Sequence, residues 1–296
     1  MKKLLPIFIA WSILMAGLPL AAQTNLFVTN PDALSIMTGD YNPVQYRPSV
    51  MTAHPDSIRM GIIRGVDPGR MIENLSRMEL FYNRNSGSDT LSLTTGIGAA
   101  RSWILAHFEQ VSKENEGRLV TGYLEFDLDI CGSGHHKNPF ALLPGLDTSN
   151  SEIIVIEGHF DTRNEDRCDT EGFTPGIDDN GSGTVLVMEL ARVMSRYAFD
   201  HTILFTTPTG EDQGLHGAKA WAEYLSANKI KIRAVLNNDI VGGIYCGRSS
   251  PQPSCPYWGH VDSTHVRIFS FRPIPVHLPI PPTSNWPGTS SMSRMN

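Results

Sequence analysis

The sequence predicts an α/β protein whose mixed central sheet carries helices on both faces. Short apolar runs at 153–156, 203–205 and 234–236 alternate with helical stretches at 183–197 and 214–227, which is the order of a strand-and-helix sheet. The 183–197 stretch is apolar on nearly all sides, as expected of a helix that packs against such a sheet. The chain has 296 residues, 41% of them hydrophobic, so it is long and apolar enough for one sizeable core.

The first half of the chain adds two helices and a strand. Asp67 followed by Pro68 is typical of a helix start, and the apolar residues that follow recur at helical spacing. A second amphipathic stripe begins after Thr95. Residues 123–130 alternate between apolar and acidic side chains, which predicts a strand with one solvated face. We expect a single α/β domain over residues 67–270.

Both ends of the chain differ from this domain. Residues 1–22 combine N-terminal lysines, an apolar run and small residues at its end, which is the pattern of a secretory signal peptide. Prolines make the run a poor membrane span, so we expect a secreted or periplasmic protein with no stable membrane insertion after signal cleavage. Residues 23–66 contain several prolines and are predicted to form an extended or partly ordered lead segment. Residues 271–296 are a proline-rich tail.

The composition excludes several classes of function. The net charge is -6 and no cluster of basic residues occurs, so nucleic acid is not an expected partner. The absence of a G-x-S-x-G sequence argues against a serine hydrolase of the α/β type. The 4 cysteines are too few for a disulfide scaffold. Cys246 and Cys255 are the first candidate pair, and free, buried cysteines are the alternative.

Candidate metal ligands follow the predicted strands of the second half, where the carboxyl ends of the strands meet at one edge of the sheet. Carboxylates gathered at such an edge repel each other unless cations compensate their charge. Imidazole together with carboxylate favours zinc over calcium or magnesium, and several anionic ligands suggest two zinc ions that share a bridging carboxylate. The candidates are His159, Asp161, Asp178, Asp179, Glu211, Asp212 and Asp239.

The chemistry of a metal-activated water suggests two roles. A water between two zinc ions has a pKa of roughly 7 and needs a base to take its proton. Glu211 is a separate carboxylate beside the candidate ligand Asp212 and suits that task. Asp161 lies two residues from His159 on the same face of an extended segment, so it suits the other imidazole N–H. His135 and its neighbour, in a glycine-rich stretch without a matching motif, are interpreted as surface residues.

Four sequence runs resemble the zinc aminopeptidases of the bacterial leucyl aminopeptidase and aminopeptidase Y group, with glutaminyl cyclases and glutamate carboxypeptidase II as more distant relatives. The runs are GHFDTR, PGIDDNGSG, TGEDQGLHGA and LNNDI, and the resemblance covers roughly residues 67–243. It implies a zinc exopeptidase-like fold, a two-zinc site and hydrolysis of N-terminal peptide bonds in peptide substrates.

The resemblance also implies individual roles. Glu211 would be the general base, and Asp161 would orient the imidazole. Relatives often carry Glu at the position of Asp212, so the denticity of this shorter ligand stays open. A cis peptide bond is expected between Asp179 and Asn180. The implied zinc ligands are the terminal ligands His159 and Asp239, the bridging Asp179, and Asp212.

One implied ligand has no counterpart. The resemblance calls for a final histidine after further strands, whereas the chain becomes rich in proline beyond about residue 270. We therefore expect a chain that is truncated or out of frame there, with His260, His265 and His277 as alternative donors. The leading hypothesis is a secreted metal-dependent aminopeptidase. The alternatives are a glutaminyl cyclase-like acyltransferase with one zinc ion and a catalytically inactive metal-binding fragment.

Overall fold

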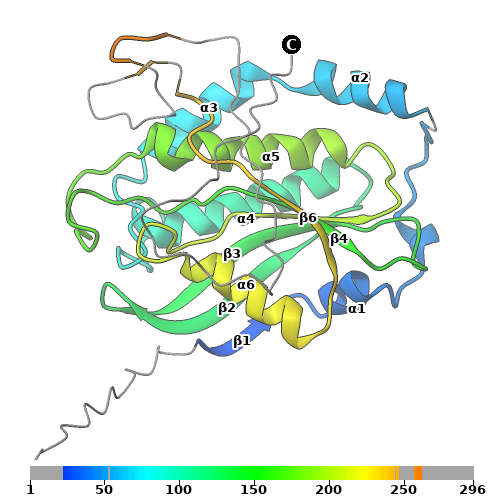
Figure 1. Cartoon of the computed structure of the whole chain (residues 1–296), viewed down its shortest axis with the longest axis horizontal. Coiled ribbons are helices and arrows are strands. Elements are labelled where there is room, and N and C mark those ends of the chain that lie inside the picture. The colour runs from blue at the N-terminus through cyan, green and yellow to red at the C-terminus, as the bar shows by residue number, and fades with distance from the viewer. Residues whose placement is uncertain (1–22, 53, 244, 247–256, 262–296) are drawn as a thin grey trace, which may run out of the picture.

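A six-stranded mixed sheet, in the order β1-β2-β3-β5-β4-β6, lies at the centre of the computed structural model (Figure 1). The structure describes residues 23–52, 54–243, 245–246 and 257–261. Neighbouring strands from β1 to β5 are antiparallel, whereas β4 is parallel to both β5 and β6. The strands are β1 (Thr24–Val28), β2 (Val120–Ile130), β3 (Ser133–Leu143), β4 (Ile153–Glu157), β5 (Thr202–Thr206) and β6 (Ile232–Asn237).

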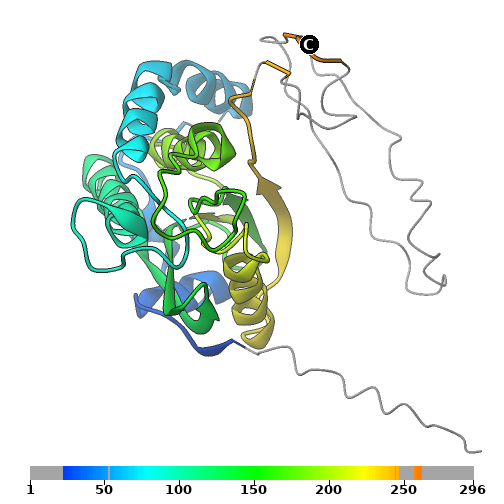
Figure 2. The ribbon, with the colours of Figure 1, turned by 90° about the vertical axis from the view of Figure 1, so that its left-hand side faces the viewer.

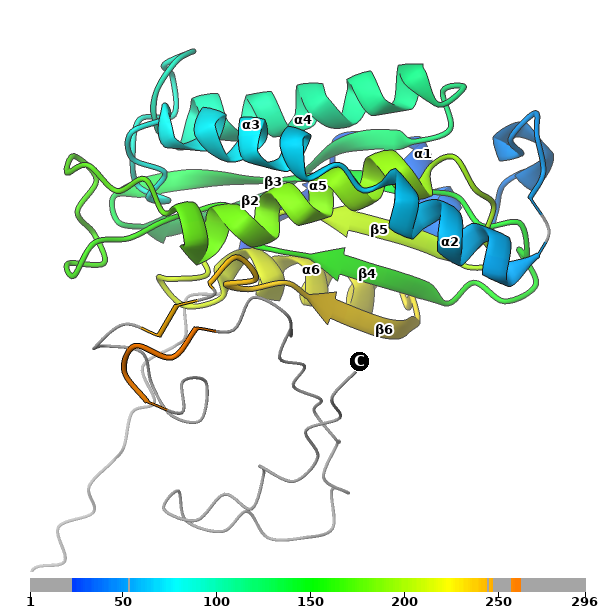
Figure 3. The ribbon, with the colours of Figure 1, turned by 90° about the horizontal axis from the view of Figure 1, so that it is seen from above.

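Helices cover both faces of the sheet, as predicted (Figure 3). One core lies between the sheet and α3, α4 and α5, and a second lies between the sheet and α1 and α6. β6 is at one edge of the sheet (Figure 2), and every residue of it is exposed. The helices are α1 (Asp32–Thr38), α2 (Pro55–Gly65), α3 (Pro68–Glu79), α4 (Gly96–Glu114), α5 (Gly183–Met194) and α6 (His216–Ala227), with a 3-10 turn η1 (Pro43–Tyr46) and a π turn η2 (Ile177–Ser182).

The start of α3 has the capping arrangement that the sequence predicts. The Asp67 carboxylate accepts a hydrogen bond from the backbone N–H of Gly69 at 2.9 Å, and Pro68 occupies the first turn. The backbone N–H of Asp67 donates to Glu189 Oε1 of α5 at 2.7 Å. The capping residue therefore also fixes the start of α3 against α5.

The prediction that residues 23–66 form an extended or partly ordered lead segment is wrong. This part contains β1, which pairs with β2, and helices α1 and α2. Ala33 and Met37 of α1 are fully buried in the second core. Pro31 precedes α1 and Pro55 opens α2, positions at which proline is compatible with a helix. These prolines mark helix starts rather than an absence of structure.

The interpretation of His135 and His136 as surface residues is right for His135, which is exposed, and wrong for His136. His135 and His136 lie in β3, opposite β2. His136 is 2% exposed, with Nε2 2.9 Å from the carbonyl oxygen of Leu128. Glu125, expected on the solvated face of β2, is buried and pairs with His135 and Lys137. The glycines of the turn are typical of a loop, so the second strand of this hairpin was not identified from the sequence.

Several expectations fall outside the described residues. They concern the signal peptide 1–22, the proline-rich tail 271–296 with the domain limit at 270, Cys255, and the alternative donors His265 and His277. His260 is described, and its ring lies 5.0 Å from that of Tyr257. None of the helices within the described ranges combines the length and apolar character that a membrane span requires.

A histidine of α4 makes the stability depend on pH. Burial, helped by the charge of Arg70, lowers the pKa of His107 to about 4. The unfolded chain binds a proton here at roughly pH 6.5, so this contribution is complete above that pH and is lost as the pH falls to about 4. We expect it to be about 3 kcal/mol, and the His107→Leu variant to lose correspondingly less unfolding free energy in urea titrations between about pH 7 and pH 4. Identical pH profiles for both proteins would contradict this assignment.

Candidate metal centre

The chain segments that follow β4, β5 and β6 meet at one edge of the sheet because these three strands are parallel. His159 and Asp161 follow β4, Glu211 follows β5, and Asp239 follows β6. Asp179 lies on the η2 turn that leads into α5. The predicted site residues therefore come from four separate segments.

His159 is at the centre of this cluster and is 3% exposed. Its Nε2 atom lies 3.3 Å from Asp179 Oδ1 and 3.8 Å from Asp239 Oδ1. The same atom is 3.9 Å from Glu211 Oε2. On the other side of the ring, Nδ1 lies 3.5 Å from Asp161 Oδ1 but has no hydrogen-bond partner among the described residues. The ring is thus surrounded by carboxylates on both sides.

Two groups of side chains bring possible ligand atoms within 4.8 Å of one another. His159, Asp179 and Asp239 form the first group, and His159, Asp161 and Asp212 form the second. With Glu211, which lies 3.9 Å from His159, the structure brings together six of the seven candidates, whereas Asp178 belongs to neither group. The structure places Asp212 beside Asp161 rather than in the group of Asp179.

The negative charge of the cluster shifts the pKa values of His159 and Asp212. Burial alone would lower the pKa of His159, but Asp161, Asp179 and Asp239 together raise it well above its usual value. Burial, with the charge of Asp161, raises the pKa of Asp212 to about 6. Both shifts are in the direction that concentrated negative charge produces. A buried imidazole with an unpartnered nitrogen among carboxylates is a donor set that fits zinc.

Asn180 joins two of the ligand-bearing segments. Its side-chain amide donates to the carbonyl oxygen of Asn238 at 2.9 Å, and its Oδ1 accepts from the backbone N–H groups of Gly183 and Ile240. The preceding peptide bond, from Asp179, is cis, as expected. This supporting role was not predicted, because Asn in a D-D-N-G run has the appearance of an ordinary turn residue.

Asp161 supports a second segment in the same way. It is fully buried, and its carboxylate accepts hydrogen bonds from the backbone N–H groups of Glu211 and Asp212 at 3.3 and 3.4 Å. Thr184 of α5 donates to the carbonyl oxygen of His159 at 2.7 Å. Asp161 therefore holds the loop after β5 as well as facing the imidazole.

A polar cavity of about 420 Å³ opens beside the cluster. Asp179 and Asp212 line it together with Thr174 and with Arg163, whose Nε donates to Asp212 Oδ1 at 2.8 Å. Arg163 stands in the GHFDTR run but was not predicted as a site residue. The ion pair between Arg163 and Asp212 forms because the fold brings the segments after β4 and β5 together, and no local sequence pattern indicates it.

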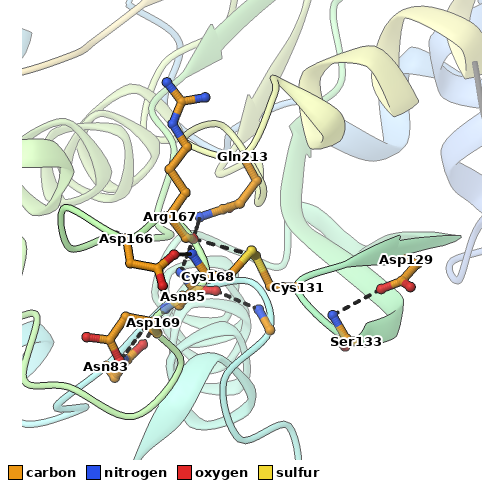
Figure 4. The surroundings of a disulfide bond; sticks show 12 residues. Asn83, Asn85, Asp129, Cys131, Ser133, Asp166, Arg167, Cys168, Asp169 and Gln213 are labelled. Carbon is orange, nitrogen blue, oxygen red and sulfur yellow. Dashed lines mark hydrogen bonds between the residues drawn. A yellow bond between two sulfur atoms is a disulfide. The ribbon is translucent and has the colours of Figure 1, made fainter.

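A disulfide bond between Cys131 and Cys168 ties the turn of the β2–β3 hairpin to the loop after β4 (Figure 4). The carbonyl oxygen of Arg167 accepts hydrogen bonds from the side chains of Asn85 and Gln213 (Figure 4). This pair was not predicted from the sequence. The predicted partner of Cys246 lies outside the described residues.

Removal of this bond should destabilise the protein. The two cysteines are separated by 37 residues, and a cross-link over such a loop contributes about 4 kcal/mol by restricting the unfolded chain. We expect the Cys131→Ala/Cys168→Ala variant to lose about this much unfolding free energy in urea denaturation. An unchanged urea midpoint with an unchanged slope would contradict the expectation.

Residues 139–265 match the model of peptidase family M28. The chain is 32% identical over 209 residues to a probable zinc metalloprotease of Pyricularia oryzae, in a match that covers 67% of this chain and 40% of that protein. It is 26% identical over 230 residues to a probable leucine aminopeptidase of Arthroderma otae, which covers 75% of this chain and 56% of the relative. The LapA aminopeptidase of Legionella pneumophila has a similar structure, with a TM-score of 0.52 and 24% identity over 66% of this chain and 49% of LapA.

These findings confirm the resemblance to zinc aminopeptidases. The chain spans 40% and 56% of the lengths of the two curated relatives. The likeness to LapA, at 24% identity, shows the fold. Residues 139–265, which include the acidic cluster around His159, therefore resemble peptidase family M28.

Proposed function

We propose that this protein is a zinc-dependent exopeptidase that removes N-terminal residues from peptides. The observation that carries the proposal is the meeting of a buried imidazole with carboxylates from three further segments at the carboxyl edge of the sheet. Similarity to a probable zinc metalloprotease and to a probable leucine aminopeptidase supports the choice of metal and of substrate.

Four residues would hold the metal, and we propose that they hold two ions. Asp179 contacts His159 and also lines the cavity with Asp212, which suits a carboxylate shared by two ions. The remaining ligand, Asp239, lies on the Nε2 side of the imidazole. When bound, zinc would polarise the scissile carbonyl and lower the pKa of a water molecule.

Glu211 has the surroundings of a general base. Burial raises the pKa of its carboxyl group, which strengthens its affinity for a proton. The side chain remains 34% exposed, so Oε2 can take a proton from water and pass it to the leaving amine. The Asp161 carboxylate accepts a hydrogen bond from the backbone N–H of Glu211. This bond holds the Glu211 residue beside the cluster.

An extracellular or periplasmic location is part of the proposal. The signal-like pattern of residues 1–22 supports export. The disulfide between Cys131 and Cys168 supports it independently, because such bonds persist mainly in oxidising compartments.

Replacement of the base should separate catalysis from metal binding. We expect Glu211→Gln to lower kcat/KM for aminoacyl-nitroanilides by about 10²- to 10⁴-fold while the bound zinc, measured by elemental analysis, is unchanged. Glu223→Gln, an exposed carboxylate of α6, is the matched control and should retain full activity. If the wild-type protein is no more active than Glu211→Gln, the chain is an inactive metal-binding fragment and the peptidase proposal fails.

One observation favours a second candidate, an acyltransferase of the glutaminyl cyclase type with a single zinc ion. Asp212 is already paired with Arg163, which leaves His159, Asp179 and Asp239 as a three-residue site. We expect wild-type protein to hold two equivalents of zinc and to lose its activity toward aminoacyl-nitroanilides after chelation. One equivalent, together with the release of ammonia from peptides that begin with Gln, would favour the cyclase instead.

A further inference from the structure

Arg84 is a buried cation behind the candidate metal centre that has no part in the reaction proposed above. It follows α3 in the chain, and its side chain is fully buried. Burial of a guanidinium is costly unless its N–H groups are hydrogen-bonded. The partners of Arg84 are therefore informative about what the residue does.

The guanidinium donates only to backbone carbonyl oxygens. Nε donates to Phe160 at 2.9 Å. Nη1 donates to Pro175 at 2.6 Å, and Nη2 donates to Gly176 at 3.0 Å. Nη1 also donates to Met78 at the end of α3, at 3.1 Å. One planar group thus binds three parts of the chain at once.

Two of these parts carry the candidate ligands. Phe160 stands between His159 and Asp161, and Gly176 precedes the η2 turn that holds Asp179. The carbonyl oxygen of Gly176 also accepts from the backbone N–H of Gly181, which closes the turn around Asp179. The Arg84 side chain therefore links the backbone behind His159 directly to the backbone that presents Asp179.

The backbone of Arg84 strengthens the same connection. Its N–H donates to Thr162 Oγ1 at 3.1 Å, and its carbonyl oxygen accepts from the Thr162 N–H at 3.2 Å. Thr162 Oγ1 in turn donates to the carbonyl oxygen of Thr174 at 3.2 Å. The main chain and the side chain of Arg84 together hold the segment after β4 and the segment before η2 in a fixed relative position.

We propose that Arg84 is a positioning residue whose guanidinium sets the separation of His159 from Asp179 and thereby the affinity of the site for zinc. The proposal rests on the zinc centre of the proposed function. Lys is no substitute at such a position, because a single ammonium cannot reproduce a planar fork of donors. Residues that fix the orientation of metal ligands typically change metal affinity by about 10- to 100-fold when replaced.

Charge and geometry make opposite predictions here. Burial lowers the pKa of Arg84 to about 10, so it remains protonated near neutral pH. A cation close to the site repels zinc, and loss of its charge alone should therefore tighten zinc binding in Arg84→Met. Loss of the backbone links should weaken binding in both Arg84→Met and Arg84→Lys, although the lysine variant keeps the charge.

Arg118 offers a matched control. It is 2% exposed and likewise donates to backbone carbonyl oxygens, those of Tyr46, Ser195 and Tyr197. These partners belong to none of the segments that carry candidate ligands. Substitution of Arg118 therefore removes the same kind of buried fork and lowers stability without altering the separation of His159 from Asp179.

The experiment measures zinc affinity by competition with a chromophoric chelator, in the wild type and in the Lys and Met variants at both positions, with folding checked by circular dichroism. We expect the dissociation constant to rise about 10-fold or more at position 84 and to stay within about 2-fold of wild type at position 118. Wild-type affinity in folded Arg84→Lys overturns the proposal, and so does tighter binding in Arg84→Met. If Arg84→Met does not fold, Arg84→Lys alone decides. Failure of the wild type to bind zinc would instead refute the proposed function.

Discussion

The concentration of negative charge around one buried imidazole is the constraint on which the site depends. Five carboxylates near His159 cannot all remain ionised in such a place without a compensating cation. Much of the surrounding structure serves to keep them there. Asp161 holds the backbone of the loop after β5, and Asn180 joins η2 to the segment after β6. The sheet supplies the edge, and these side chains fix the segments that leave it.

Much of this could be anticipated from local patterns. The strands after residue 150 are short apolar runs, and the acidic residues follow them directly, so the edge at which they meet was predictable. The cap at Asp67 is a two-residue signal and was equally accessible. The runs GHFDTR, PGIDDNGSG, TGEDQGLHGA and LNNDI add specificity, because all four occur in one chain.

The parts that were missed depend on contacts between distant segments. Glu125 became buried because β3 lies opposite it, and no local signal identified β3 behind the glycines of its turn. The prolines of residues 23–66 fit helix starts as well as they fit irregular chain. Arg163 pairs with Asp212 across 49 positions, and the fork of Arg84 reaches Gly176 across 92. Composition and periodicity do not indicate such contacts between distant residues.

The bond between Cys131 and Cys168 also has a consequence for the cavity beside the cluster. It anchors the loop that begins at Arg163 to a hairpin on another part of the sheet, and Arg163 lines the cavity. In a reducing environment this wall would be retained by hydrogen bonds and by the ion pair of Arg163 with Asp212, and it would sample more conformations. The shape of the cavity would then depend on the redox state of its surroundings.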